Sequence, residues 1–128
     1  GSKRAVVVHG HDGLDEISVC APTRVSELRD GMIRTYDIAP EQFFGKLSEP
    51  EELLGGDPDT NAAITKSILT GAKGAKRDVI LLNTAAALTA AGKAEKLNDG
   101  IRLAENAIDS GAAMEKLDAL IRFTRENG

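Results

Sequence analysis

The sequence predicts one domain of the α/β class, with a central-type strand, a β-hairpin and four C-terminal helices. Three observations support this: a β-branched run near the N-terminus, an Asp-Gly turn signal inside an alternating segment, and helical patterns after residue 57. A chain of 128 residues suits one domain and is long enough to bury a core.

The first predicted element is a strand at residues 5–8, with the sequence AVVV. An apolar run without alternation is typical of a strand that is covered on both faces. One such strand cannot form a sheet alone, and the sequence shows no parallel neighbours for it. We therefore expect the chain either to assemble with another chain or to be part of a larger domain.

The second predicted element is a β-hairpin over residues 23–38. Its Asp30-Gly31 pair is a strong signal for a two-residue type I′ turn, because both positions there need a positive φ. Such a turn fixes the register. The predicted cross-strand pairs are Val25 with Tyr36, Leu28 with Ile33, Glu27 with Arg34 and Arg24 with Asp37.

A short turn of helix should follow Pro40, and a loop should follow that turn. Helical patterns occupy the rest of the chain. The first long helix should begin after Asp57 as N-cap, with Pro58 at its first position, and end at Gly71. The others should span about residues 76–91, 95–110 and 113–126. The second of the four should be the most buried, because it is apolar nearly all round.

Composition excludes several classes of function. The formal net charge is −4 and aromatic residues make up 3%, which disfavours a nucleic acid or a membrane surface as a partner. The longest uncharged run, 79–92, is too short to span a bilayer. The one cysteine, Cys20, cannot form an internal disulfide, and no signal peptide is visible, so we expect a cytoplasmic protein. Cys20 itself should be a small buried residue rather than a reactive thiol.

The segment 6–18, VVVHGHDGLDEIS, holds the candidate metal ligands. His9, His11 and Asp12 are similar to a zinc signature, but their spacing is wrong and the chain has no further histidine, whereas zinc needs three or four ligands. We expect His9 to form a hydrogen bond at the strand end and His11 to be solvated. Asp15 and Glu16 are adjacent carboxylates that suit Mg²⁺ shared with substrate phosphates. Their spacing alone leaves open whether they bind a metal or are only solvated.

Two further segments invite a phosphate-binding interpretation. The run 55–58, GGDP, lacks the lysine of a P-loop and is better explained as the entry to a capped helix. The basic cluster at 73–77 could bind phosphate, but a solvated turn between helices is the simpler interpretation.

Several separated motifs, in order, resemble the anthranilate phosphoribosyltransferase family. They are VVVHGHDGLDEIS, APTRVSELRDGMIRTYDIAPEQF, GGDPDTNAAI, ILTGAKGAKRDVILLNTAAAL and AIDSGAAMEKLDAL. The resemblance covers about residues 3–125. It implies the C-terminal part of the α/β catalytic domain shared by nucleoside phosphorylases and phosphoribosyltransferases, in a protein with a separate helical domain.

The resemblance implies a glycosyltransferase of tryptophan biosynthesis. That family joins anthranilate to the ribose of 5-phosphoribosyl pyrophosphate and releases pyrophosphate. Its GLDE segment binds Mg²⁺ on the pyrophosphate, and the matching positions here are Asp15 and Glu16. The other substrate-binding residues stay unassigned.

The family's glycine-rich pyrophosphate loop, its KHGNR-type segment and its anthranilate-contacting arginine have no match in the chain. We expect them upstream of residue 1, with residues 1–128 forming one piece of the α/β domain that is inactive alone. No residue is a convincing general base or nucleophile, so no catalytic residue is assigned. A ribosyl-transfer enzyme similar to pyrimidine nucleoside phosphorylase and a non-catalytic folding or assembly domain are the alternatives. Association into a homo-oligomer is left open.

Overall fold

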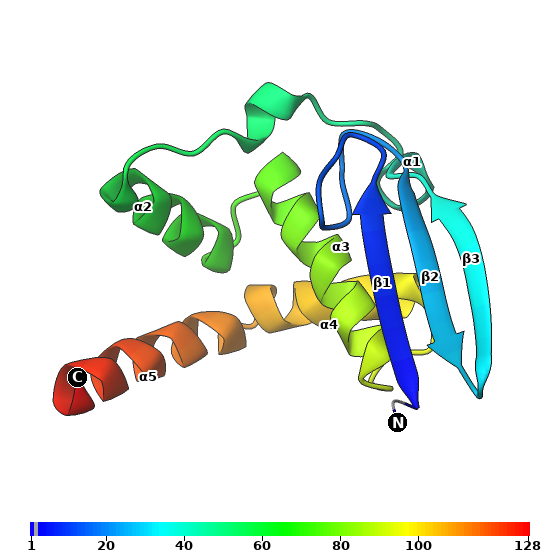
Figure 1. Cartoon of the computed structure of the whole chain (residues 1–128). Coiled ribbons are helices and arrows are strands. Elements are labelled where there is room, and N and C mark those ends of the chain that lie inside the picture. The colour runs from blue at the N-terminus through cyan, green and yellow to red at the C-terminus, as the bar shows by residue number, and fades with distance from the viewer. Residues whose placement is uncertain (2) are drawn as a thin grey trace.

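The computed structural model describes Gly1 and residues 3–128. Figure 1 shows a small sheet at one side of the molecule, with helices packed against one face. The strands are β1 (Arg4–Gly10), β2 (Thr23–Arg29) and β3 (Met32–Ile38). The helices are α1 (Glu41–Phe44), the 3₁₀ helix η1 (Pro50–Leu53), α2 (Pro58–Leu69), α3 (Ala75–Ala90), α4 (Leu97–Asp109) and α5 (Ala112–Asn127). The α/β class predicted from the sequence is confirmed.

The hairpin is formed by β2 and β3 in the predicted register. Asp30 and Gly31 have φ values of 52° and 76°, as a type I′ turn requires. The structure pairs the residues as predicted: Val25 with Tyr36, Leu28 with Ile33, Glu27 with Arg34, and Arg24 with Asp37.

The two faces of the hairpin differ in what covers them. Val25 faces the helices and is 2% exposed, whereas Ile33 lies on the opposite face and is 73% exposed. The Arg24 guanidinium binds Asp37 through two hydrogen bonds of 2.8 and 3.1 Å. Glu27 instead accepts a hydrogen bond from the hydroxyl of Tyr36 at 3.2 Å. The register was therefore predicted correctly, but the Leu28–Ile33 pair adds nothing to the core.

The first strand differs from its prediction. β1 pairs with β2 in an antiparallel ladder, and the order β1-β2-β3 leaves it at an edge of the sheet formed by the described residues. Val6 and Val8 pack against the core, but Val7 is 67% exposed. Within this chain β1 is neither central nor covered on both faces. The run of valines indicated a buried strand, and the second covering layer is not supplied by the described residues.

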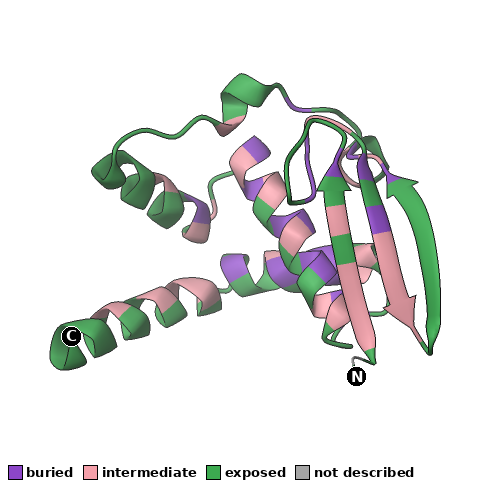
Figure 2. Ribbon diagram, in the orientation of Figure 1, coloured by how far each residue is buried: buried purple, intermediate pink, exposed green. Residues whose placement is uncertain are grey.

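The core lies between the sheet and α3, with α4 crossing behind (Figures 1 and 2). The buried apolar cluster includes Ile17, Val25, Leu81, Leu82, Ala85, Ile101 and Ala104. α3 contributes more buried residues than α2, α4 or α5, as predicted. The Asp57 carboxylate caps α2 by accepting a hydrogen bond from the amide of Thr60 at 2.7 Å. None of the helices among the described residues has the length and apolar character needed to cross a membrane.

Candidate metal-binding loop

The segment between β1 and β2 folds into a tight loop at the end of the sheet. The amide of Gly10 donates to the carbonyl of Leu14 at 2.8 Å, and that of Gly13 donates to the carbonyl of Gly10 at 2.9 Å. The amide of His11 reaches across the loop to the carbonyl of Pro22 at 2.9 Å. Gly13 has a φ of 93°, a conformation that favours glycine. These bonds give the loop a defined shape.

The side chain of Asp12 stabilises this loop through hydrogen bonds. Its carboxylate accepts a hydrogen bond from the hydroxyl of Ser18 at 2.5 Å and a longer one, 3.4 Å, from the amide of Leu14. A Cβ on Gly10 would clash with the Asp12 carboxylate, so a side chain there would displace Asp12 from its hydrogen bond with Ser18. Asp12 therefore has a structural role, which the sequence pattern did not reveal.

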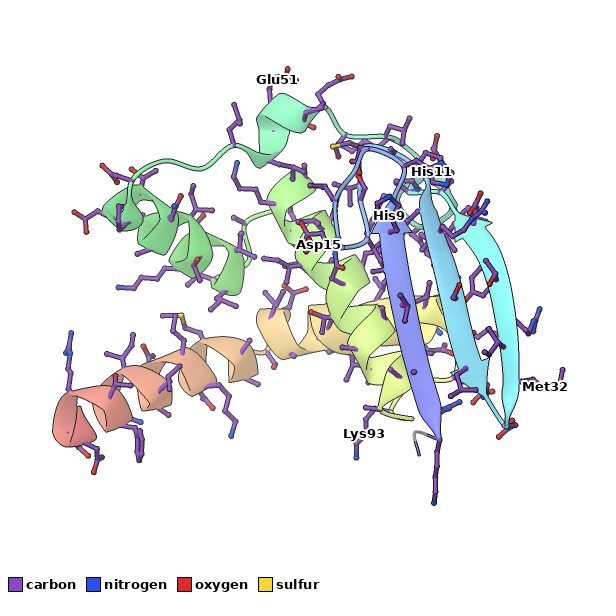
Figure 3. All side chains as sticks on the ribbon, in the orientation of Figure 1. His9, His11, Asp15, Met32, Glu51 and Lys93 are labelled. Carbon is purple, nitrogen blue, oxygen red and sulfur yellow. The ribbon has the colours of Figure 1, made fainter. Side chains whose placement is uncertain are left out.

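Asp15 and Glu16 lie on the outside of the loop, and both are exposed. The next three residues, 17–19, turn inward and are each about 1% exposed. Figure 3 shows Asp15 on the part of the loop that faces α3, whereas His9 and His11 lie at the end of the sheet. The two carboxylates are thus exposed to solvent, and the residues that directly follow them are buried in the core.

The histidines do not join the carboxylates. His11 places Nε2 3.5 Å from a carboxylate oxygen of Asp37 on β3, and its side chain is about half exposed. The side chain of His9 is exposed and makes no hydrogen bond within the described part of the chain. The expectation that His9 would be bonded at the strand end is therefore wrong, because its position on β1 points it to the uncovered face.

The donor set fits one class of metal better than another. Among residues 1 and 3–128, no three His, Cys, Asp or Glu side chains come close enough to hold a metal ion between them. Zinc, which needs three or four protein ligands, does not fit this loop. Two exposed carboxylates do fit Mg²⁺, which prefers oxygen, keeps several waters and shares its remaining positions with phosphates.

A shallow hollow of about 290 Å³ lies beside Glu16, between α2 and α3. Lys76 contributes to its wall and donates a hydrogen bond to the carbonyl of Glu52 at 2.7 Å. Ile64 and Ile68 of α2 and Val79 of α3 also line it. The hollow is open, so Glu16 is reachable from solvent on this side as well.

The basic cluster at 73–77 is largely occupied by partners within the chain. Arg77 is 2% exposed and binds the Asp109 carboxylate through hydrogen bonds of 2.8 and 3.0 Å. Lys73 lies 3.9 Å from the same carboxylate. The bonds from Arg77 hold the pKa of Asp109 below its ordinary value. The cluster therefore joins α3 to α4. Arg77 is buried against Asp109, so it is not free to bind a phosphate group.

Cys20 is half-buried in the last part of the loop, before β2 begins. Burial, reinforced by the nearby Asp12 carboxylate, raises the pKa of its thiol. A raised pKa keeps the thiol protonated and unreactive at neutral pH. This agrees with the prediction that Cys20 is not a reactive thiol, although the residue is only partly buried.

Sequence reasoning missed the residue that anchors the loop to the helices. Asn83, at the middle of α3, forms two hydrogen bonds of 2.9 Å with the backbone of Ile17. The hydroxyl of Thr23 also accepts a hydrogen bond from the amide of Ser18 at 3.0 Å. An asparagine inside an apolar helix was the only signal in the sequence that could have indicated such a contact.

Comparison with known proteins gives consistent matches. Residues 1–114 match the model of the glycosyl transferase family, a/b domain. The chain is 61% identical over 127 residues to the anthranilate phosphoribosyltransferase of Syntrophobacter fumaroxidans, and 60% identical over 128 residues to that of Desulfatibacillum aliphaticivorans. These alignments cover 99% and 100% of this chain but 38% of each relative, to whose C-terminal portion the chain corresponds.

Solved structures agree with these matches. The crystal structure of anthranilate phosphoribosyltransferase from Thermus thermophilus aligns with a TM-score of 0.83 and 36% identity, over 95% of this chain and 36% of that one. The Saccharomyces cerevisiae enzyme in complex with PRPP and Mg aligns with a TM-score of 0.76 and 29% identity, over 88% of this chain and 33% of that one. The resemblance identified from the sequence motifs is confirmed.

Proposed function

This chain belongs to the glycosyl transferase family, a/b domain, and we propose that it forms the C-terminal part of an anthranilate phosphoribosyltransferase. The observation that carries the proposal is an identity of 60% or more to two such enzymes, over essentially the whole chain. The complete protein would transfer the phosphoribosyl group of 5-phosphoribosyl pyrophosphate to anthranilate and release pyrophosphate. Because Cys20 has no partner cysteine in the sequence, we also propose a reducing, cytoplasmic location.

Asp15 and Glu16 are the proposed ligands of Mg²⁺ in that reaction. Both are exposed on a loop with a buried base, and their oxygens are the donors that Mg²⁺ prefers. A similar solved structure is described as a complex with PRPP and Mg. When bound, the metal would neutralise negative charge that develops on the leaving pyrophosphate.

The residues of this chain would position the metal ion and would not transfer a proton. The two carboxylates would hold the metal, and the hydrogen bonds within the loop would keep the carboxylates in position. The two histidines of the chain, His9 and His11, lie at the end of the sheet and not beside the carboxylates (Figure 3). The displacement at the ribose carbon would therefore depend on binding, orientation and charge.

The remainder of the α/β domain would continue the sheet at β1. Its outer edge is unpaired within the described residues, and Val7 is 67% exposed although its sequence context is typical of a covered strand. The chain spans 38% of its relatives, which leaves ample sequence for further strands and for a separate helical domain. We therefore expect residues 1–128 alone to show no phosphoribosyl transfer to anthranilate.

The test compares two double variants in the complete protein. Asp15→Ala with Glu16→Ala should raise the Mg²⁺ concentration needed for half-maximal activity at least tenfold, because the metal loses both protein oxygens. His9→Ala with His11→Ala is the matched control, since it removes two polar side chains from the same segment. It should leave the Mg²⁺ dependence unchanged. Steady-state rates measured at several Mg²⁺ concentrations show whether the carboxylate pair or the histidine pair affects the Mg²⁺ dependence. A change of this dependence in the histidine variant alone would refute the assignment.

A further inference from the structure

Asn83 makes an unusual contact for a side chain in the middle of an apolar helix. Its Oδ1 accepts a hydrogen bond from the amide of Ile17, and its Nδ2 donates to the carbonyl of the same residue, both at 2.9 Å. Nδ2 also donates to the carbonyl of Val79, one turn earlier in α3, at 2.9 Å. With an acceptor and two donors engaged, the amide group has one orientation that satisfies it. Asn83 therefore binds the backbone of Ile17 much as a neighbouring strand would.

The bound residue directly follows the two proposed metal ligands. Ile17 is the next residue after Glu16 and the second after Asp15, and its own side chain is 1% exposed in the core. The neighbours of Asn83 in α3, Leu81 and Leu82, are also 1% exposed. The contact thus connects the exposed carboxylates to α3, which has more buried residues than α2, α4 or α5.

A second set of bonds holds the other side of the loop. The Ser18 amide donates to the hydroxyl of Thr23, and the Ser18 hydroxyl donates to the Asp12 carboxylate. These bonds close the loop on itself, but they do not connect it to the helices. Among the described residues, Asn83 makes the hydrogen bonds that join the loop to α3, in addition to the packing of Ile17 in the core.

Resting on the proposed role of Asp15 and Glu16, we propose that Asn83 is a positioning residue for this metal-binding pair. Its two bonds to Ile17 set the direction in which the carboxylates leave the loop. Mg²⁺ demands near-octahedral geometry, so a loop that is already ordered avoids an ordering cost when the metal binds. Partners that orient metal ligands commonly change metal affinity by about 10–100-fold.

The experiment uses Mn²⁺ as a paramagnetic probe on the 128-residue chain. Broadening of the backbone amide signals of Asp15 and Glu16 gives the apparent Mn²⁺ affinity, and amide hydrogen exchange at Ile17 reports the contact without any metal. The test variant is Asn83→Ala. Asn83→Asp keeps the acceptor for the Ile17 amide and loses the donor to its carbonyl, so it should restore part of the exchange protection.

Two control variants separate the proposal from general destabilisation. Asn61→Ala removes a similar two-bond amide contact, which Asn61 makes to the backbone of Gly56 at 2.8 and 3.0 Å. Thr89→Ala removes a buried hydroxyl from the far end of α3, where it bonds the carbonyl of Ala85. Neither side chain contacts Ile17 through a hydrogen bond, so both variants should keep native Mn²⁺ affinity and native exchange at Ile17.

We expect Asn83→Ala to speed exchange at Ile17 at least tenfold and to weaken Mn²⁺ binding about tenfold. Native exchange and native Mn²⁺ affinity in this variant, with binding lost in Asp15→Ala with Glu16→Ala, would overturn the role of Asn83 alone. Native Mn²⁺ binding in the double carboxylate variant would overturn the proposed metal site itself. If Asn83→Ala does not fold, Asn83→Asp decides by the same exchange measurement: native protection at Ile17 contradicts the proposal, and intermediate protection supports it.

Discussion

Helices α3 and α5 are equal in length, 16 residues each, but differ in almost every other respect. α3 lies between the sheet and α4 and has seven buried residues, whereas α5 has none. Figure 2 shows the contrast in burial along the two helices. Leu120 and Phe123 of α5 are 58% and 63% exposed, whereas Leu81 and Leu82 of α3 are each 1% exposed.

The difference follows from the position of each helix as well as from the more apolar sequence of α3. α5 begins after Gly111, whose φ of 84° ends α4, and then runs away from the sheet (Figure 1). The buried residues of α3 are spread from Ala75 to Thr89, whereas the partly buried residues of α5 end at Ile121. An amphipathic pattern therefore indicates which face of a helix can be buried, but whether it is buried depends on what lies beside it.

The largest expected effect compares a leucine from each helix. Leu82→Ala should cost about 2–5 kcal/mol of unfolding free energy, because the side chain is 1% exposed and its removal leaves a cavity. Leu120→Ala in α5 should change it by about 0.5 kcal/mol or less, since that side chain faces solvent. Urea unfolding of both variants measures the difference. Equal losses would show that α5 is packed in solution.

A smaller effect is expected where α3 meets α4. A Cβ placed on Gly100 of α4 would lie 2.8–2.9 Å from backbone and side-chain atoms of Ala85 in α3. Gly100→Ala should therefore cost about 1–3 kcal/mol through overpacking, which outweighs the gain of about 1 kcal/mol in helix propensity. Thermal unfolding measures the net change. A more stable variant would mean that the two helices can separate at little cost.

The smallest effect concerns pH at the junction of α3, α4 and α5. Because Arg77 holds the pKa of Asp109 below its ordinary value, the ionised carboxylate stabilises the fold above about pH 4, and this contribution is lost as pH falls through the lowered pKa. The advantage of the native chain over Asp109→Asn should thus be present at pH 7 and shrink towards pH 3. Melting temperatures of both proteins over this range test it. A constant difference would contradict the ion-pair explanation.

Local signals accounted for most of the fold. The Asp30-Gly31 turn fixed the register of the hairpin, and Asp57 with Pro58 located the start of α2, because each depends on a few adjacent residues. The exposure of Val7 on β1 and of Leu120 on α5 could not be predicted, since it depends on what lies beside each element.

The sequence indicated the exposed carboxylates of the candidate site but not the residues that hold them in place. Asp15 and Glu16 were selected as carboxylates on a turning loop, and the structure places them on its exposed side. The role of Asn83 was missed because a hydrogen bond between residues 66 positions apart leaves no periodic trace in the sequence. The role of Asp12 was missed because its bond to Ser18, six residues away, depends on how the loop folds. Arg77 was grouped with solvated cations, although it is buried against Asp109.

The open edge of β1 also affects how the isolated chain should behave in concentrated solution. Unpaired backbone amides and carbonyls along an exposed strand act as a template for another strand, and proteins commonly block such edges with charge or proline. Here the edge carries valines, and Arg4 at its start reaches inward to the carbonyl of Thr89 at 3.3 Å. We therefore expect edge-to-edge association of the isolated chain at β1, and Val7→Lys should suppress it by placing a charge on this edge.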